Sequence, residues 1–127
     1  MTQILPKLIS LGTSVPPHRI TQADVLSILV QAKGQALPPR MAEILGNTGI
    51  SQRHIAVPPE YYFNARSWAG RARVYENTAA QMFEAAAAQA LTRAGMKAAE
   101  IGQIVFVSTT GTMTPSLPSR MIASISF

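Results

Sequence analysis

Two short apolar runs along the chain predict buried strands. The first covers residues 7–13 and ends in glycine and threonine, which favours a turn after the strand. The second covers residues 104–107, where every residue is apolar and most are β-branched. Because no polar residue alternates with the apolar ones there, we expect both faces to be covered, as in a parallel sheet. The pattern therefore predicts an α/β fold.

Between these runs, start and stop signals delimit two helices. Thr21 can cap a helix that extends to about Lys33. Asp24 suits the first turn of that helix, and Gly34 follows its last turn. A shorter helix is predicted over residues 40–48, where a proline precedes the segment and a glycine follows it.

A third predicted helix has the clearest pattern. It begins at Thr78, which can form a capping box with Gln81, and it ends before Gly95. Small or aromatic apolar residues recur in it at helical spacing: Ala79, Phe83, Ala86, Ala87, Ala90 and Ala94. Since small side chains let two backbones come together, so many alanines predict an unusually close neighbouring element.

The remaining segments have no steady period or are short. Residues 50–75 mix arginines with aromatic residues and predict a loop with short helical turns. Residues 108–112 are small and polar and follow the second predicted strand at its carboxyl end. In open α/β sheets this edge is where ligands bind. The apolar residues 121–127 predict the start of another helix.

The composition predicts one soluble globular domain. The chain has 127 residues, of which 47% are hydrophobic and 13% charged, and this excludes intrinsic disorder. No apolar run approaches the roughly 20 residues of a membrane span, so we expect none. The start at Met1 has neither a basic nor a long apolar segment, so we expect no export signal. The absence of cysteine excludes disulfides, cysteine metal sites and a cysteine nucleophile within these residues.

The net charge of +5 arises from 11 Lys and Arg against 6 Asp and Glu. Arginine outnumbers lysine and favours bidentate contacts with phosphate and carboxylate, so an anionic partner is a reasonable expectation. Five basic residues lie close together in sequence: Arg53, His54, Arg66, Arg71 and Arg73. They follow no single helix face and no nucleic-acid motif, so we predict a solvated surface strip and no nucleic-acid partner.

The residues by themselves give little support for catalysis. Neither His18 nor His54 lies near a serine motif or a suitably placed carboxylate, which disfavours a catalytic triad. Nothing supplies a third ligand for a metal site with these two histidines.

Several segments together resemble one enzyme family. Residues 48–54 (TGISQRH) resemble the TGIxxRH segment of condensing enzymes with the thiolase fold. The opening residues 8–13, the aromatic stretch 59–75 and residues 107–117 (VSTTGTMTPSL) narrow this resemblance. Together they resemble the amino-terminal part of bacterial type III polyketide synthases, which are relatives of chalcone and stilbene synthases. The resemblance extends over nearly the whole chain and about the first third of such an enzyme.

The resemblance implies a homodimer with a thiolase-like αβαβα fold, of which residues 1–127 form an incomplete amino-terminal half, and no metal or bound cofactor. In this family a cysteine accepts an acyl group from acyl-CoA. A histidine and an asparagine then promote decarboxylation of malonyl-CoA for repeated Claisen condensations. These three residues belong to later segments, so we expect the chain to end before its nucleophile and to be inactive alone. The use of CoA thioesters implies a cytoplasmic protein.

The resemblance also assigns four binding residues: Arg40, Thr109, Thr110 and Thr114. The arginine matches a cation that contacts the phosphates of coenzyme A, with a helix-start residue or a surface salt bridge as the alternatives. Glu43 and Asn47 stand where plant relatives have basic residues, which predicts a different or weaker CoA entrance.

The threonines match two parts of the acyl cavity. Thr109 and Thr110 match its lining, with plain strand-end polarity as the alternative. Thr114 matches the residue that reaches across the dimer into the partner's cavity. It is shorter than the methionine of chalcone synthases, which leaves more room for a long acyl starter.

Two other functions remain open. β-Ketoacyl-acyl carrier protein synthase III has the same fold and the same TGIxxRH segment, but fits residues 60–68 and 114–117 less well. The alternative of another class is a truncated, non-catalytic chain that acts only by pairing with a partner subunit.

Overall fold

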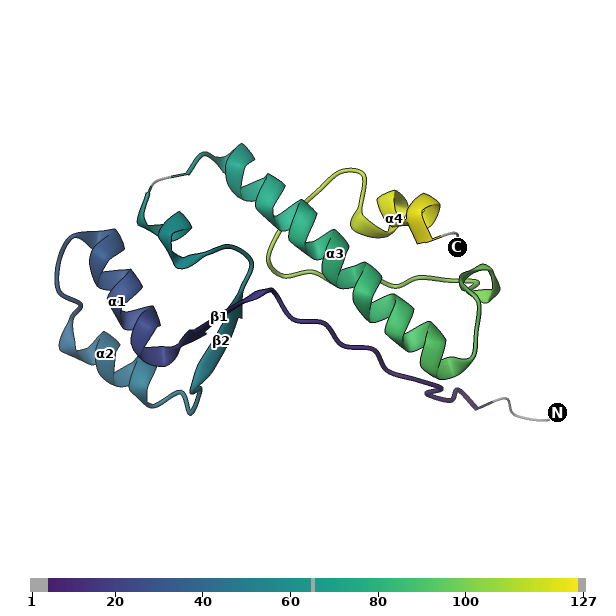
Figure 1. Ribbon diagram of the computed structural model, residues 1–127, viewed down its shortest axis with the longest axis horizontal. Helices are drawn as coiled ribbons and strands as arrows, with labels where there is room; N and C mark the ends of the chain where they lie inside the picture. The colour runs from purple at the N-terminus through teal and green to yellow at the C-terminus, as the bar shows by residue number, and fades with distance from the viewer. Residues whose placement is uncertain (1–4, 65, 126–127) are drawn as a thin grey trace. The chain divides into compact units, whose positions relative to one another are not determined.

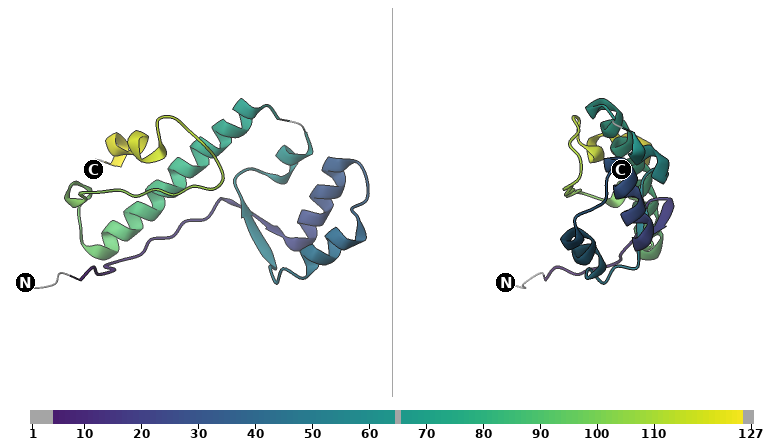
Figure 2. Two further views of the ribbon diagram at one scale, coloured as in Figure 1. Left: turned by 180° about the vertical axis from the view of Figure 1, so that it is seen from behind. Right: turned by 90° about the vertical axis from the view of Figure 1, so that its left-hand side faces the viewer.

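The computed structural model describes residues 5–64 and 66–125. These divide into two compact units: one contains residues 15–74, and the other combines the stretch up to Ser14 with the stretch from Tyr75 onward. Figure 1 follows the chain through its elements, and Figure 2 shows the same ribbon from behind and from one side.

The unit of residues 15–74 contains a two-stranded antiparallel sheet. Strand β1 (His18–Thr21) pairs with strand β2 (Gln52–Ile55), so that Ile20 lies opposite Arg53. Ile20 is buried between the sheet and the rest of its unit, with 7% of its surface exposed. The prediction of a loop throughout residues 50–75 is wrong for β2, because its hydrogen-bonding partner lies more than 30 residues away and leaves no local signal.

Helix α1 (Gln22–Lys33) confirms the predicted bounds. Thr21 caps it: the Asp24 N–H donates to the Thr21 hydroxyl oxygen at 3.1 Å, and the Asp24 carboxylate accepts from the Thr21 N–H at 2.7 Å. This reciprocal pair satisfies two donors that the first turn would otherwise leave unpaired. Gly34 ends the helix, and its N–H donates to carbonyls of the last turn.

Helix α2 (Pro39–Gly46) is shorter than the predicted 40–48. The Thr48 hydroxyl donates to the Leu45 carbonyl at 2.9 Å, which closes the last turn before the helix reaches Thr48. The side chain of Gln22 joins three elements, since its amide donates to Leu45 O at 2.6 Å and its oxygen accepts from Arg53 Nε at 3.2 Å. A 3₁₀ turn, η1 (Pro59–Phe63), follows β2 and confirms a short helical turn in this region.

Helix α3 (Trp68–Ala94) begins ten residues before the predicted start at Thr78, so Thr78 lies inside the helix and does not cap it. The preceding turns contain no proline, and nothing stops the helix from extending into them. The predicted end is confirmed. The Gly95 N–H donates to the Thr92 carbonyl at 3.2 Å and the Met96 N–H to the Leu91 carbonyl at 3.1 Å, a closing pattern typical of glycine at this position.

In the second unit, residues 5–14 run in an extended conformation along α3 (Figures 1 and 2). A Cβ atom on Gly12 would collide with the carbonyl oxygen of Ala86, so only glycine fits there. This confirms the close approach that the alanines predict. Three polar contacts accompany it: Ser10 Oγ to Ala90 O at 2.8 Å, Thr13 N to Gln89 Oε1 at 2.9 Å, and Arg93 Nη1 to Leu11 O at 2.6 Å.

The prediction of a buried strand over residues 7–13 is therefore wrong, because the segment is neither a strand nor buried. No strand lies beside it among the described residues, and its backbone bonds to side chains of α3 instead of to a neighbouring strand. Leu8, Ile9 and Leu11 are 87%, 69% and 64% exposed, because only one side of the segment faces the helix.

The second predicted strand, residues 104–107, is also not a strand in the structure. It follows a 3₁₀ turn, η2 (Ala98–Glu100), and is extended without a ladder among the described residues. Phe106 packs edge-on against Phe83 of α3, with ring centroids 6.3 Å apart. Val105 and Val107 are 80% and 82% exposed, so the prediction that both faces are covered is wrong.

Helix α4 (Leu117–Ile125) confirms the predicted helix near the end but begins four residues earlier than expected. Leu117 and Met121 lie one turn apart and are 1% and 6% exposed. They form the buried core of this unit among the described residues. Ser126 and Phe127, which the prediction included, lie outside the described residues.

The capping geometry predicts a specific acid titration. Hydrogen bonds from Thr21, the backbone N–H first and the hydroxyl second, hold the pKa of Asp24 below its ordinary value of 3.8. The ionised carboxylate therefore stabilises the fold above that value, and the contribution is lost as the pH falls through the lowered pKa. Thr21→Val removes the hydroxyl and should raise the Asp24 pKa towards its ordinary value, measured by NMR titration.

The matched control for this titration is Ser27→Ala. The Ser27 hydroxyl donates to the Ala23 carbonyl in the same helix and makes no contact with Asp24. An Asp24 titration that is the same in Thr21→Val and in the parent would contradict the capping box.

The exposed apolar segments predict loose packing of the 127 residues in isolation. Surfaces such as those of Leu8, Val105 and Val107 should bind the dye ANS, and thermal unfolding should be broad. The double variant Val105→Thr/Val107→Thr should bind less dye with unchanged helical circular dichroism. Sharp, cooperative thermal unfolding of a monodisperse sample would contradict the prediction of loose packing.

Candidate functional site

The segment that follows residue 107 is organised by one serine. The Ser108 hydroxyl lies 2.7 Å from the Tyr75 hydroxyl, 3.4 Å from the Gly111 carbonyl oxygen and 3.5 Å from the Thr110 N–H nitrogen. A hydroxyl has one proton to donate and two lone pairs. All three contacts are satisfied when Ser108 donates to Gly111 and accepts from Tyr75 and Thr110. The turn over residues 108–111 is thus closed on itself and tied to α3.

The tyrosine ring also contacts this turn. A Cβ atom on Gly111 would collide with Cγ and Cδ1 of the Tyr75 ring, so the ring lies directly against the backbone at Gly111. The turn therefore has two contacts with one side chain, a hydrogen bond at Ser108 and a van der Waals contact at Gly111.

Thr109, Thr110 and Thr114, which the sequence assigns to an acyl cavity, lie on or just after this turn and are exposed. Among the described residues, none of the three hydroxyls has a hydrogen-bond partner. Thr114 precedes Pro115 across a cis peptide bond. The structure brings the three threonines onto one short segment and leaves their hydroxyls available to a ligand.

Helix α4 fixes the other end of the segment. Arg120 Nη1 lies 3.1 Å from Glu76 Oε2, an ion pair between α4 and α3. At the start of α4, the hydroxyls of Ser116 and Ser119 are 2.9 Å apart. Adjacent residues of α3, Tyr75 and Glu76, thus hold the two ends of the stretch that contains the three threonines.

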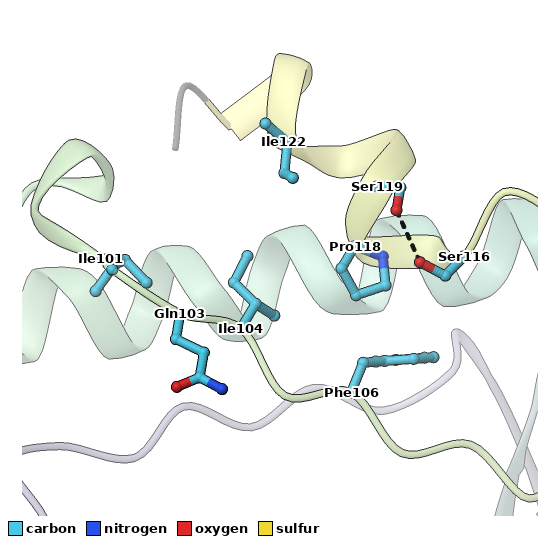
Figure 3. A pocket seen from close by; sticks show the side chains of 9 residues that line it. Ile101, Gln103, Ile104, Phe106, Ser116, Pro118, Ser119 and Ile122 are labelled. Carbon is cyan, nitrogen blue, oxygen red and sulfur yellow. Dashed lines mark hydrogen bonds between the residues drawn. The ribbon is translucent and has the colours of Figure 1, made fainter.

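A cavity of about 510 Å³ lies between α4 and the extended segment 101–106 (Figure 3). Its lining is mostly apolar: Ile101, Gly102, Gln103, Ile104, Phe106, Ser116, Pro118, Ser119 and Ile122. The three predicted threonines do not line it. The predicted acyl-cavity residues and this hollow are therefore different places within the same unit.

Arg40 lies in the first turn of α2 and is exposed. No ion pair involves Arg40 in residues 5–64 and 66–125, so the surface salt bridge considered for it does not form there. Glu43 follows three positions later on the same helix, where a carboxylate would repel a phosphate held by Arg40. The guanidinium is free to contact an anion, with an acidic neighbour beside it.

The basic strip is less free than the sequence suggests. The Arg53 guanidinium is engaged by Gln22, and His54 Nδ1 lies 3.0 Å from the Pro16 carbonyl oxygen. The Arg71 guanidinium lies 5.7 Å from the centroid of the Trp68 ring. Most of these basic side chains therefore contact partners in their own unit as well as solvent.

Aromatic contacts account for a further member of the strip. The Arg66 guanidinium lies 4.7 Å from the centroid of the Tyr61 ring, which packs edge-on against Tyr62 at 5.6 Å. Partial burial raises the pKa of the Tyr62 hydroxyl, and the neighbouring Tyr61 raises it further. The Tyr61 hydroxyl is buried and has no hydrogen-bond partner within the described part of the chain. This cluster is a packing element of residues 15–74.

The described residues show neither a cluster of metal ligands nor a helix that could span a membrane. They contain no group of three or more His, Asp or Glu side chains that could hold a metal ion. None of their helices is both long and apolar enough to cross a membrane.

Comparison with known sequences gives relatives of one kind, although no protein-family model matches the chain. Phloroglucinol synthase of Pseudomonas fluorescens is 36% identical over 110 residues, which are 84% of this chain and 31% of that protein. The 1,3,6,8-tetrahydroxynaphthalene synthase of Streptomyces coelicolor is 34% identical over 118 residues, 91% of this chain and 31% of that protein. The chain spans about a third of the length of the curated relatives it matches.

Solved structures give the same picture. The 1,3,6,8-tetrahydroxynaphthalene synthase of Streptomyces coelicolor, described as a bacterial type III polyketide synthase, matches with a TM-score of 0.81 and 32% identity. The match covers 93% of this chain and 35% of that one. PKS-I of the brown alga Ectocarpus siliculosus matches with a TM-score of 0.76 at 22% identity, a likeness of fold alone. The predicted thiolase-like α/β fold is confirmed for the part that the chain spans.

Proposed function

We propose that this chain is part of a bacterial type III polyketide synthase, an acyltransferase that builds polyketides, and that it spans about a third of such an enzyme. The reaction is decarboxylative Claisen condensation of malonyl-CoA onto an acyl-CoA starter. The relatives are named after phloroglucinol and tetrahydroxynaphthalene, which are small polyhydroxylated aromatic molecules, so the product is of that chemical class.

Within this reaction the described residues bind and shape, and do not form the covalent bond. The hydroxyls of Thr109 and Thr110 line the acyl cavity, and Thr114 reaches across a homodimer into the cavity of the partner subunit. The observation that best supports this proposal is the set of three unpartnered threonine hydroxyls on one segment, which is tied down at both ends. Such hydroxyls can donate to or accept from the carbonyl groups of a growing polyketide.

Arg40 contacts the phosphates of coenzyme A. Guanidinium groups bind phosphate through two parallel hydrogen bonds, and this one is exposed and without an ion-pair partner in the described chain. Glu43 weakens the site through repulsion, so we expect modest affinity for CoA. Because CoA thioesters are the substrates, the enzyme functions in the cytoplasm.

The nucleophile comes from elsewhere in a synthase of this family. The 127 residues contain no cysteine, so they supply no thiolate to accept the acyl group. We propose that both compact units belong to one partial thiolase-like domain, which precedes the segment with the catalytic cysteine. The named relatives favour a polyketide synthase over a β-ketoacyl-acyl carrier protein synthase.

Replacement of Arg40 tests the CoA contact. In the complete protein, Arg40→Ala should raise KM for acyl-CoA roughly tenfold with little change in kcat, because a contact made equally in ground and transition states is lost. Arg40→Lys should recover only part of the affinity, since the ammonium group cannot form two parallel bonds. Initial rates of CoA release give both constants.

Lys33→Ala is the control for this experiment, since Lys33 is an exposed cation at the end of α1. An unchanged KM in Arg40→Ala would assign Arg40 to the helix start alone.

Enlargement of Thr114 tests the function through the cavity. With acyl-CoA starters of increasing length and malonyl-CoA, Thr114→Met should shift the products of the complete protein towards shorter starters or fewer extensions, resolved by mass spectrometry. Thr112→Met is the matched control, because Thr112 is an exposed threonine of the same segment without an assigned role. If the complete protein formed no polyketide, the proposed function would fail; if only the profile stayed constant, Thr114 would not bound the cavity.

A further inference from the structure

The turn that contains Thr109 and Thr110 depends on a residue outside it. Tyr75 lies 33 positions before Ser108, on the first half of α3, and its hydroxyl lies 2.7 Å from the Ser108 hydroxyl. The other two contacts of Ser108, at 3.4 and 3.5 Å, are within the turn itself and are longer. Of the three, the Tyr75 contact is therefore the strongest, and it connects the turn to a long helix.

The ring of Tyr75 makes a second contact with the turn, at Gly111. It lies directly against Gly111, where a side chain larger than hydrogen would collide with it. One contact is at the first residue of the turn and one at its last. A turn held at both ends by the same side chain can neither slide along α3 nor rotate without breaking one of the contacts.

We propose that Tyr75 is a positioning residue for the acyl cavity, an inference that rests on the proposed function. Its hydroxyl holds Ser108 and its ring supports Gly111. The two threonines between those residues, Thr109 and Thr110, thereby present their hydroxyls at a constant place in the cavity wall. Tyr75 contacts no substrate in this proposal. It acts through Ser108, and it determines how sharply the cavity selects the length of the polyketide.

Three alternative roles for Tyr75 have less support. Its hydroxyl is engaged by Ser108, which disfavours a free proton donor. The cavity between α4 and residues 101–106 is not lined by Tyr75, so it does not serve that hollow. The neighbouring Glu76 already accounts for the contact with α4 through Arg120, so the anchoring of α4 does not need Tyr75.

The test is a double-mutant cycle in the complete protein. Tyr75→Phe removes the hydroxyl and keeps the ring on Gly111, while Ser108→Ala removes the other partner of the same bond. Tyr75→Phe should lower the ratio of the main polyketide to shorter and longer products roughly threefold to tenfold, the effect of one hydrogen bond. Ser108→Ala should lower it by at least as much, because it also loses the contacts with Gly111 and Thr110. The double variant should match Ser108→Ala alone, because the bond to Tyr75 is already lost in that variant and can be lost only once.

The readout separates positioning from simple loss of stability. Product ratios and kcat/KM are measured with a short and a long acyl-CoA starter, each with malonyl-CoA, and the melting temperature is measured for every variant. Tyr62→Phe is the control: Tyr62 belongs to the 3₁₀ turn η1 of the other compact unit, where its ring packs against Tyr61. It should leave the product ratio unchanged.

Each outcome decides a different question. A shared, non-additive broadening of the products in Tyr75→Phe and Ser108→Ala supports the inference. If the parent protein is active but the effects of the two variants add, or the variants keep the parent's product ratio, the role of Tyr75 is overturned and the proposed function stands. A parent protein that forms no polyketide from these substrates overturns the proposed function, and the inference with it.

Discussion

Helix α3 comes unusually close to the extended segment 5–14 within their compact unit, and this proximity determines what else can form there. Alanines on the helix and Gly12 on the extended segment leave no room for a side chain between the two backbones. Once they are in contact, Ser10 Oγ reaches the Ala90 carbonyl. The same helix supports residues 104–107 through Phe83, and it holds the turn of the candidate site through Tyr75. Without this helix, neither the extended segments nor the turn would have a surface to lie on.

The extended segment 5–14 forms part of its backbone hydrogen bonds with side chains of a helix. Gln89 and Arg93 of α3 bond to main-chain atoms of Thr13 and Leu11, where a sheet would have supplied a neighbouring strand. These bonds use one side of the chain. Apolar side chains of the same segment, such as Leu8, are left in contact with solvent. The turn of the candidate site is likewise contacted from one side within the described residues, by Tyr75 of α3.

The ends of helices could be predicted from the sequence where the signal is local. Thr21 and Asp24 lie three residues apart and specify the start of α1, and Gly95 specifies the end of α3. The strands could not be predicted, because the pairing of Ile20 with Arg53 joins positions far apart in the chain. An apolar run such as 104–107 indicates contact with other apolar atoms, but it does not say whether the contact is with a strand or a helix.

In the candidate site, too, some features could be predicted from the sequence and others depend on contacts between distant residues. Arg40 and the three threonines follow from a resemblance, and the structure shows where they lie. The contact between Tyr75 and Ser108 was beyond sequence reasoning, although both residues belong to segments that support the resemblance. A tyrosine on a helix and a serine after an apolar run have no recognisable spacing. Their relation follows only from the path of the chain between them.

The separation of Ser10 from its partner Ala90 also has a consequence for synthesis on the ribosome. The two residues are 80 positions apart, and every residue of the other compact unit lies between them. At ribosomal rates of roughly 5–20 residues per second, the amino-terminal segment waits on the order of 4–16 seconds before α3 is complete. During that interval its exposed leucines and isoleucine have no surface of their own unit to contact. The segment therefore docks only after the whole of the other unit has been synthesised, and during that time a chaperone can bind it.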